Sequence, residues 1–189
     1  PIAMRWGRGQ GPFIRPIQWI LALFGQEIIH MECFGIHSGE VTYGHRFMSG
    51  SESINGLAIK INDASSYELE LEKKGHIIVD PKKRLSLIKK RLSEKSQSDQ
   101  ALLDEVVYLV EKPHMIEGCF DVSFLELPEE VLIECMKKHQ KYFPVYHKDG
   151  TLDRTCLVVA DNVTKKNRSQ IIEGNQTVLS ARLKDALFF

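Results

Sequence analysis

The sequence predicts an α+β fold: a mixed, mainly antiparallel sheet built from hairpins, with packed helices and a C-terminal helix. Two segments rich in aromatic and β-branched residues, 142–146 and 155–160, flank the turn-forming residues Lys148-Asp149-Gly150, which is typical of a hairpin. Helical periodicity occurs between such strand segments without the regular strand–helix–strand alternation of a parallel sheet. These observations favour antiparallel pairing over a doubly wound fold.

The first elements are predicted to be a loop and a short helix. Glycines and a proline exclude regular structure over residues 1–12. Pro16 suits the first turn of a helix that runs to Phe24, and Gly25 suits its end.

A hairpin and a third strand are expected next. Residues 27–36 and 40–48 have the composition of strands, and Ser38-Gly39 is predicted to form the turn between them. A further strand is predicted from Gly56 to Ile61.

Helices dominate the middle of the chain. Asp63 or Ser65 is predicted to cap a helix that runs to Lys74, and a short strand is predicted over 76–79. The helix at 81–95 places three apolar residues on one stripe and basic residues on the rest, namely Leu85, Ile88 and Leu92 against Lys82, Lys83, Arg84, Lys89, Lys90, Arg91 and Lys95.

The carboxyl-terminal half completes the predicted sheet. A helix over 100–111 ends before Pro113, and residues 114–120 are predicted to form a strand. Pro128 with its acidic neighbours opens the next helix, and a last helix begins near Lys166.

Composition limits the classes of function. The chain has 189 residues, of which 43% are hydrophobic, and its formal net charge is zero. A contact with a polyanion must therefore come from local patches. No segment has the roughly 18 apolar residues that cross a bilayer, and no secretory signal is recognised. We expect a cytoplasmic piece of a longer protein, with no membrane partner.

Neither a metal site nor a catalytic residue is predicted. The four cysteines are far apart and form no CxxC pair, so buried free thiols are expected for Cys33, Cys119, Cys135 and Cys156. His30 and Cys33 would point to opposite faces of a strand. No serine or cysteine stands in a recognisable nucleophile motif.

The most distinctive stretch is 136–145, where a helix ends in a burst of positive charge. Lys137, Lys138 and Lys141 supply cations, and Tyr142 and Phe143 follow them as aromatic residues. Cations beside flat apolar faces suit a polyanion that carries bases, so this stretch predicts contact with RNA.

Other cations extend this hypothesis. The basic helix offers Lys89, Lys90 and Arg91 to an RNA backbone, although a solvated face is the ordinary explanation of such a helix. Arg168, Asn175 and Arg182 recur every seven residues and share one face of the last helix, and a polar face of this type suits contact with another domain or with RNA. The candidate RNA-binding residues are Arg5, Arg8, Arg46, Lys89, Lys90, Arg91, Lys137, Lys138, Lys141 and Arg182.

Several segments, in order along the whole chain, resemble the bacterial glycyl-tRNA synthetase beta subunit. They are Met4-Arg5-Trp6-Gly7, Phe13-Ile14-Arg15-Pro16-Ile17-Gln18-Trp19, Gly44-His45-Arg46-Phe47, Leu127-Pro128-Glu129-Glu130-Val131, Gln140-Lys141-Tyr142-Phe143-Pro144-Val145, Glu173-Gly174-Asn175 and Ala181-Arg182-Leu183-Lys184-Asp185-Ala186. Segment 49–62 has no clear match, and Lys112 stands where such sequences often carry tryptophan.

The resemblance implies a single α+β body domain over residues 1–189, in which the helix at 165–189 leads to the next domain. It implies an α2β2 glycine-tRNA ligase whose active site, with ATP and Mg²⁺, lies on the alpha subunit, so this part needs no cofactor of its own. The implied partners are the alpha subunit, tRNA(Gly) and the other beta-subunit domains. Two alternatives remain open: an editing hydrolase of mischarged tRNA, and a purely structural docking module.

Overall fold

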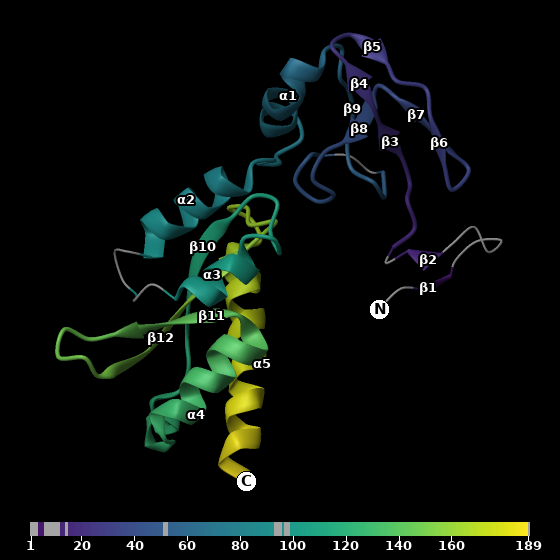
Figure 1. The fold of residues 1–189 in the computed structure, drawn as a ribbon. Coiled ribbons are helices and arrows are strands. Elements are labelled where there is room, and N and C mark those ends of the chain that lie inside the picture. Colours follow the sequence, from purple (N-terminus) through teal and green to yellow (C-terminus); the bar gives the residue numbers. More distant parts are fainter. Residues whose placement is uncertain are drawn as a thin grey trace. The chain divides into compact units, whose positions relative to one another are not determined.

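The computed structural model describes two compact units, Pro1–Val79 and Asp80–Phe189, each of which is treated by itself (Figure 1). The described residues are 4–5, 12–13, 15–50, 53–92, 96 and 99–188. The fold class is α+β as predicted, with short, mainly antiparallel strands and a long C-terminal helix. Residues 1–189 are predicted to form one body domain, and within it the internal contacts group the chain into these two units.

The unit Pro1–Val79 is built from short strands and one helical segment. Its antiparallel pairs are β1 (Met4–Arg5) with β2 (Pro12–Phe13), β4 (Leu23–Phe24) with β5 (Glu27–Ile28), β6 (Glu32–Cys33) with β7 (Ile36–Gly39), and β8 (Val41–Tyr43) with β9 (Ala58–Lys60). Strand β3 (Ile20–Leu21) pairs with β7 in parallel.

The predicted helix from Pro16 to Phe24 is wrong, because this segment is extended and contains β3 and β4. Gly25 has φ +60° and lies in the turn that joins β4 to β5, where Leu23 pairs with Ile28. A glycine with positive φ serves a hairpin turn as well as a helix end. Local sequence alone therefore does not separate the two.

The predicted turn at Ser38-Gly39 is also wrong, since both residues belong to β7. The turn lies at Phe34-Gly35, where both φ angles are positive (53° and 76°) and Cys33 pairs with Ile36. A two-residue turn with two positive φ angles matches the twist of the strands it joins. Phenylalanine is a rare residue in that conformation, so residue type does not signal this turn.

The predicted strand over 40–48 is too long. Strand β8 ends at Tyr43, and the next residues form a turn in which the His45 Nδ1 accepts hydrogen bonds from the amides of Phe47 (3.1 Å) and Met48 (3.2 Å). Only β9 matches its predicted range closely.

The helical segment of this unit is confirmed. Asp63 accepts from the Ser65 amide and caps the short helix Ala64–Ser66, which continues into α1 (Tyr67–Lys73). The predicted strand at 76–79 is wrong, because His76 has φ +56° and the Ile77 amide donates back to the Leu71 carbonyl (3.0 Å).

Gly44 and Gly56 bring two backbone segments of this unit into direct contact. The Gly44 amide donates to the Leu57 carbonyl (2.8 Å), and a Cβ at Gly56 would lie 2.3 Å from the Gly44 oxygen. Gly56 also has φ +91°. A Cβ at Gly44 would lie 2.7 Å from the Gly75 Cα, so the glycine of the motif Gly44-His45-Arg46-Phe47 leaves room for the backbone of Gly75.

The unit Asp80–Phe189 is a three-stranded antiparallel sheet with helices on both faces. Its strands, in the order β10-β12-β11, are β10 (His114–Cys119), β12 (Leu152–Ala160) and β11 (Tyr142–Tyr146). Its helices are α2 (Pro81–Leu92), α3 (Gln100–Val106), η2 (Val122–Glu126), α4 (Glu129–Glu134), the π-turn η3 (Cys135–His139) and α5 (Arg168–Phe188). The hairpin and helices α2, α4, η3 and α5 agree with the sequence prediction. The helix predicted over 100–111 is too long, since α3 ends at Val106, and η2 is not predicted.

Each face of this sheet buries its own core. Cys156 and Val158 of β12 pack with residues of α4, η3 and α5, including Leu132, Met136, Leu179 and Leu183. The intervening Leu157 packs with Phe143 and with residues of α2 and α3, including Ile88, Leu92, Leu103 and Val106. Because strand side chains alternate between faces, the helices must cover both sides. None of the described helices is long and apolar enough to span a membrane.

One polar contact ties the sheet to α5. The Tyr142 hydroxyl donates to Asn175 Oδ1 (2.5 Å), and Asn175 Nδ2 donates to the Ile171 carbonyl (2.6 Å). Burial raises the pKa of Tyr142 to about 12, so the hydroxyl keeps its proton and remains a donor.

Gly56→Ala should destabilise the chain strongly. The new Cβ meets the Gly44 carbonyl and the backbone conformation is strained, so a loss on the order of 3 kcal/mol is expected in urea denaturation. Gly50→Ala is the control, because Gly50 also has positive φ (+71°) but nothing lies within 4 Å of its Cβ position. It should lose about 1 kcal/mol. Equal losses of unfolding free energy in both variants would show that the contact between the new Cβ and the Gly44 carbonyl has no energetic cost.

Tyr142→Phe should lower the free energy of unfolding by about 1 to 2 kcal/mol, because the half-buried Asn175 oxygen loses its donor. Tyr146→Phe is a matched control on the same strand, since among the described residues the Tyr146 hydroxyl has no hydrogen bond. Its expected change is about zero. Urea denaturation measures both, and an unchanged Tyr142→Phe variant would mean that the bond contributes nothing.

Candidate nucleic-acid interface

The lysine-rich end of η3 is balanced by carboxylates of the same unit. Lys137 Nζ lies 2.9 Å from Asp99, and Lys138 Nζ lies 2.7 Å from Glu134. Lys141 Nζ lies 2.8 Å from Glu105. A phosphate at this surface would have to displace these partners or share the lysines with them.

The pKa values follow these contacts. Hydrogen bonds from the Leu102 amide and from Lys137 lower the pKa of Asp99, and the hydrogen bond from Lys138 lowers the pKa of Glu134. Glu134 in turn raises the pKa of Lys138. The carboxylates beside Lys137 and Lys138 are therefore held in their ionised form.

The prediction that Tyr142 and Phe143 offer aromatic faces to bases is wrong. Tyr142 is 4% exposed and Phe143 is fully buried. They are neighbours on β11, so their side chains enter the two different cores on the two sides of the sheet. Neither ring is available for stacking on a nucleotide.

The basic residues in the last turn of α2 are more exposed than the aromatic residues of β11. Lys89 Nζ donates to Gln100 Oε1 (3.0 Å), and Lys90 is exposed. Arg91, in the last turn of α2, lines a cavity of about 490 Å³. The other residues that line this cavity are Leu87, Pro113, His114, Met115, Glu117, Leu157 and Arg168. We call it the β10 groove, because four of its residues lie on β10 or directly before it.

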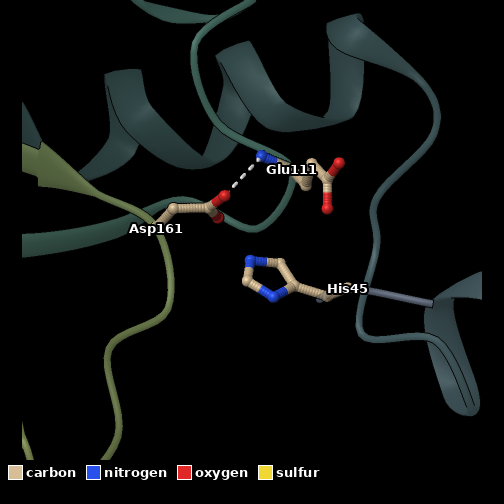
Figure 2. Close-up of side chains that lie close together, drawn as sticks. All are labelled: His45, Glu111 and Asp161. Carbon is tan, nitrogen blue, oxygen red and sulfur yellow. Dashed lines mark hydrogen bonds between the residues drawn. The ribbon is translucent and has the colours of Figure 1, made fainter. Parts of the chain in front are cut away.

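The loop before β10 is held in place by Asp161. Its carboxylate accepts hydrogen bonds from the amides of Glu111 (3.3 Å) and Lys112 (2.9 Å), the first of which is drawn in Figure 2. These bonds connect the end of β12 with the segment that leads into Pro113 and His114. The wall of the groove is therefore anchored to the central strand of the sheet.

A second set of hydrogen bonds places Arg168 at the start of α5. The Thr164 amide donates to Asn167 Oδ1 (2.7 Å), and Asn167 Nδ2 donates to the Asn162 carbonyl (2.8 Å). The loop between β12 and α5 is thereby closed on itself. Its buried Val163 fixes it further to the core under α5.

The remaining candidate residues belong to the unit Pro1–Val79 or to α5, and two of them lie outside the described side chains. Arg46 is exposed, with its guanidinium carbon 5.9 Å from the centre of the Phe47 ring. Arg182 is exposed on α5. Only the backbone of Arg5 is described, in β1, and Arg8 lies outside the described residues.

Arg168 is not among the residues predicted to bind RNA. Heptad spacing places it on one face with Asn175 and Arg182, but Asn175 is engaged by Tyr142 and only the two arginines are exposed. No local pattern brings Arg168 to Arg91, because that proximity depends on how α2 and α5 pack on the sheet. The structure therefore adds to the ten candidates a cation that the sequence marks only by its heptad spacing.

Comparison with known proteins gives a consistent result over the whole chain. Residues 1–189 match the family model described as glycyl-tRNA synthetase beta subunit. The chain is 43% identical over 195 residues to the glycine–tRNA ligase beta subunit of Halothermothrix orenii and 42% identical over 196 residues to that of Bacillus subtilis. The corresponding protein of Neisseria meningitidis serogroup B is 38% identical over 196 residues.

All of this chain is covered in these comparisons, but it spans only 27% to 28% of the length of the three relatives. The resemblance stated from the sequence is thus confirmed at the level of the family. The chain belongs to the glycyl-tRNA synthetase beta subunit family.

Proposed function

We propose that residues 1–189 form a non-catalytic part of a glycine-tRNA ligase beta subunit, which contributes to tRNA recognition and to assembly of the enzyme. The family match over all 189 residues carries this proposal. In it, ATP-dependent formation of glycyl-tRNA, with its Mg²⁺, is the work of the alpha subunit. The partners are the alpha subunit, tRNA(Gly) and the other domains of the beta subunit.

The surface of the unit Asp80–Phe189 supports a role in binding RNA. A cation without a carboxylate partner can bind a phosphate without breaking an ion pair. The three lysines at the end of η3 must first break theirs, which are Lys137–Asp99, Lys138–Glu134 and Lys141–Glu105. We therefore rank exposed arginines above these lysines as phosphate contacts. Arg182 and Arg91 are exposed.

The outer face of α5 favours an additional role in docking. Val178, one turn after Gly174 on the same face of this helix, is 47% exposed. Gly174 stands in the helix interior, although glycine there costs about 1 kcal/mol relative to alanine, and nothing lies within 4 Å of its Cβ position. A bare backbone beside an exposed apolar side chain suits close approach of another protein segment.

Photo-cross-linking tests the role in RNA binding. We expect tRNA(Gly) carrying 4-thiouridine to cross-link, in the intact enzyme, to peptides from residues 80–189, because phosphates drawn to the exposed arginines bring bases within reach. Mass spectrometry locates the cross-links, and a tRNA that the enzyme does not charge is the control. Cross-links confined to other parts of the enzyme would contradict this role. Hydrolysis of alanyl- or seryl-tRNA by the 189-residue chain would contradict its non-catalytic assignment.

Gly174→Leu tests docking, because the two expected effects have opposite signs. Leucine should stabilise the isolated chain by up to about 0.8 kcal/mol in urea denaturation, as a better helix former with free space around it. In the intact enzyme the added bulk should weaken association between subunits or domains, seen as earlier dissociation on dilution in sedimentation velocity.

Ser86→Leu on the exposed side of α2 is the matched control and should leave assembly unchanged. If Gly174→Leu assembles as well as the unaltered enzyme, the outer face of α5 is not a docking surface.

A further inference from the structure

The β10 groove lies wholly within the unit Asp80–Phe189 and is lined by both charged and apolar residues. Arg91 comes from the last turn of α2, and Arg168 is the first residue of α5. Leu87, Met115 and Leu157 supply apolar surface between them. A volume of about 490 Å³ falls within the range of about 300 to 1,000 Å³ that is typical of ligand pockets.

The two guanidinium groups of the groove differ from the lysines at the end of η3. Among the residues that the structure describes, neither Arg91 nor Arg168 makes a side-chain hydrogen bond or ion pair. Each guanidinium retains its fork of N–H donors, which matches two oxygens of one phosphate. The groove is thus supplied with donors that no described residue of the unit satisfies.

The other polar groups of the groove set limits on its ligand. His114 Nδ1 lies 2.9 Å from the Lys112 carbonyl, and a carbonyl only accepts, so Nδ1 carries hydrogen. Its Nε2 is then an acceptor in the neutral ring and a donor in the protonated ring. Glu117 adds one carboxylate against two arginines. This balance suits a singly charged phosphodiester better than a densely charged polyphosphate.

We propose that the β10 groove binds the phosphodiester backbone of an RNA strand, with Arg91 and Arg168 each holding a phosphate. The apolar side chains of Leu87 and Met115, which line the groove, accommodate the ribose or base next to the bound phosphate. This inference rests on the proposed role in tRNA recognition and assigns that role to one surface. It also separates the groove from the lysine-rich end of η3, whose cations already have counterions.

The salt dependence of tRNA binding by the intact enzyme tests the groove. The logarithm of the binding constant falls as the logarithm of the salt concentration rises. Each phosphate that a variant no longer holds should make this slope less steep by about 0.7 to 0.9. Arg91→Gln and Arg168→Gln should each show one such reduction, and the double variant about twice as much. Filter binding at several salt concentrations measures the slopes, and circular dichroism verifies that the variants fold.

The control removes the same charge elsewhere. Lys138→Gln with Lys141→Gln changes net charge as much as the double arginine variant, but takes away cations that are paired with Glu134 and Glu105. We expect its slope to change by less than half as much. Arg91→Lys with Arg168→Lys keeps the charge and loses the fork, so its affinity should fall while its slope stays close to the original.

The result that would contradict RNA binding by the β10 groove differs from the result that would contradict a role in tRNA recognition. If the arginine variants keep the original slope while photo-cross-links still map to residues 80–189, RNA contacts this unit at another surface and the groove is excluded. If no cross-link maps to the region and the slope is also unchanged, both proposals fail. Equal reductions in the arginine and lysine double variants would also overturn the groove, because they indicate a diffuse effect of charge.

Discussion

Strand β12 is buried on both faces, and this constraint organises the unit Asp80–Phe189. Cys156 and Val158 enter the core under α5, while Leu157 enters the core under α2 and α3. Both sides must be covered, since a bare face would expose apolar side chains. Helices α2 and α5 therefore approach the sheet from opposite faces and both contact β10 at its edge. The meeting of Arg91 and Arg168 at this edge follows from that arrangement.

Periodic patterns predicted this unit well. Leu85, Ile88 and Leu92 mark α2 because one apolar stripe faces the sheet, and the aromatic and β-branched segments around Lys148-Asp149-Gly150 mark the hairpin of β11 and β12. In the unit Pro1–Val79 the strands are two to four residues long, too short to show alternation. Gly25 and Phe34 adopt positive φ there because they lie in the turns of the β4–β5 and β6–β7 hairpins. The local sequence does not reveal which strands pair.

The sequence predicts which basic residues the candidate site contains. It does not predict which of them are free of carboxylate partners and so able to bind a phosphate. Lys137, Lys138 and Lys141 stand out in the sequence, yet the counterions of Lys137 and Lys141 lie far along the chain, in or just before α3. Tyr142 and Phe143 look like stacking faces until the sheet buries them. Arg168 is marked in the sequence only by its heptad spacing. Long-range packing decides which cations have a carboxylate partner. The spacing of residues along a helix carries no information on that packing.

The contrast between paired lysines and unpaired arginines has a physical consequence for recognition. An ammonium group that already lies near a carboxylate gains little when a phosphate replaces that carboxylate, because one ion pair is exchanged for another. The guanidinium groups of Arg91 and Arg168 have no ion pair or side-chain hydrogen bond with a described residue, so a phosphate displaces no carboxylate there. The planar arrangement of their N–H donors also fixes the direction from which a phosphate must come. Asp161 and Asn167 hold the two segments that frame this groove through backbone and side-chain hydrogen bonds. A rigid frame reduces the entropy lost when a flexible strand binds, so a few well-placed arginines can contribute more than a larger number of lysines on an exposed helix end.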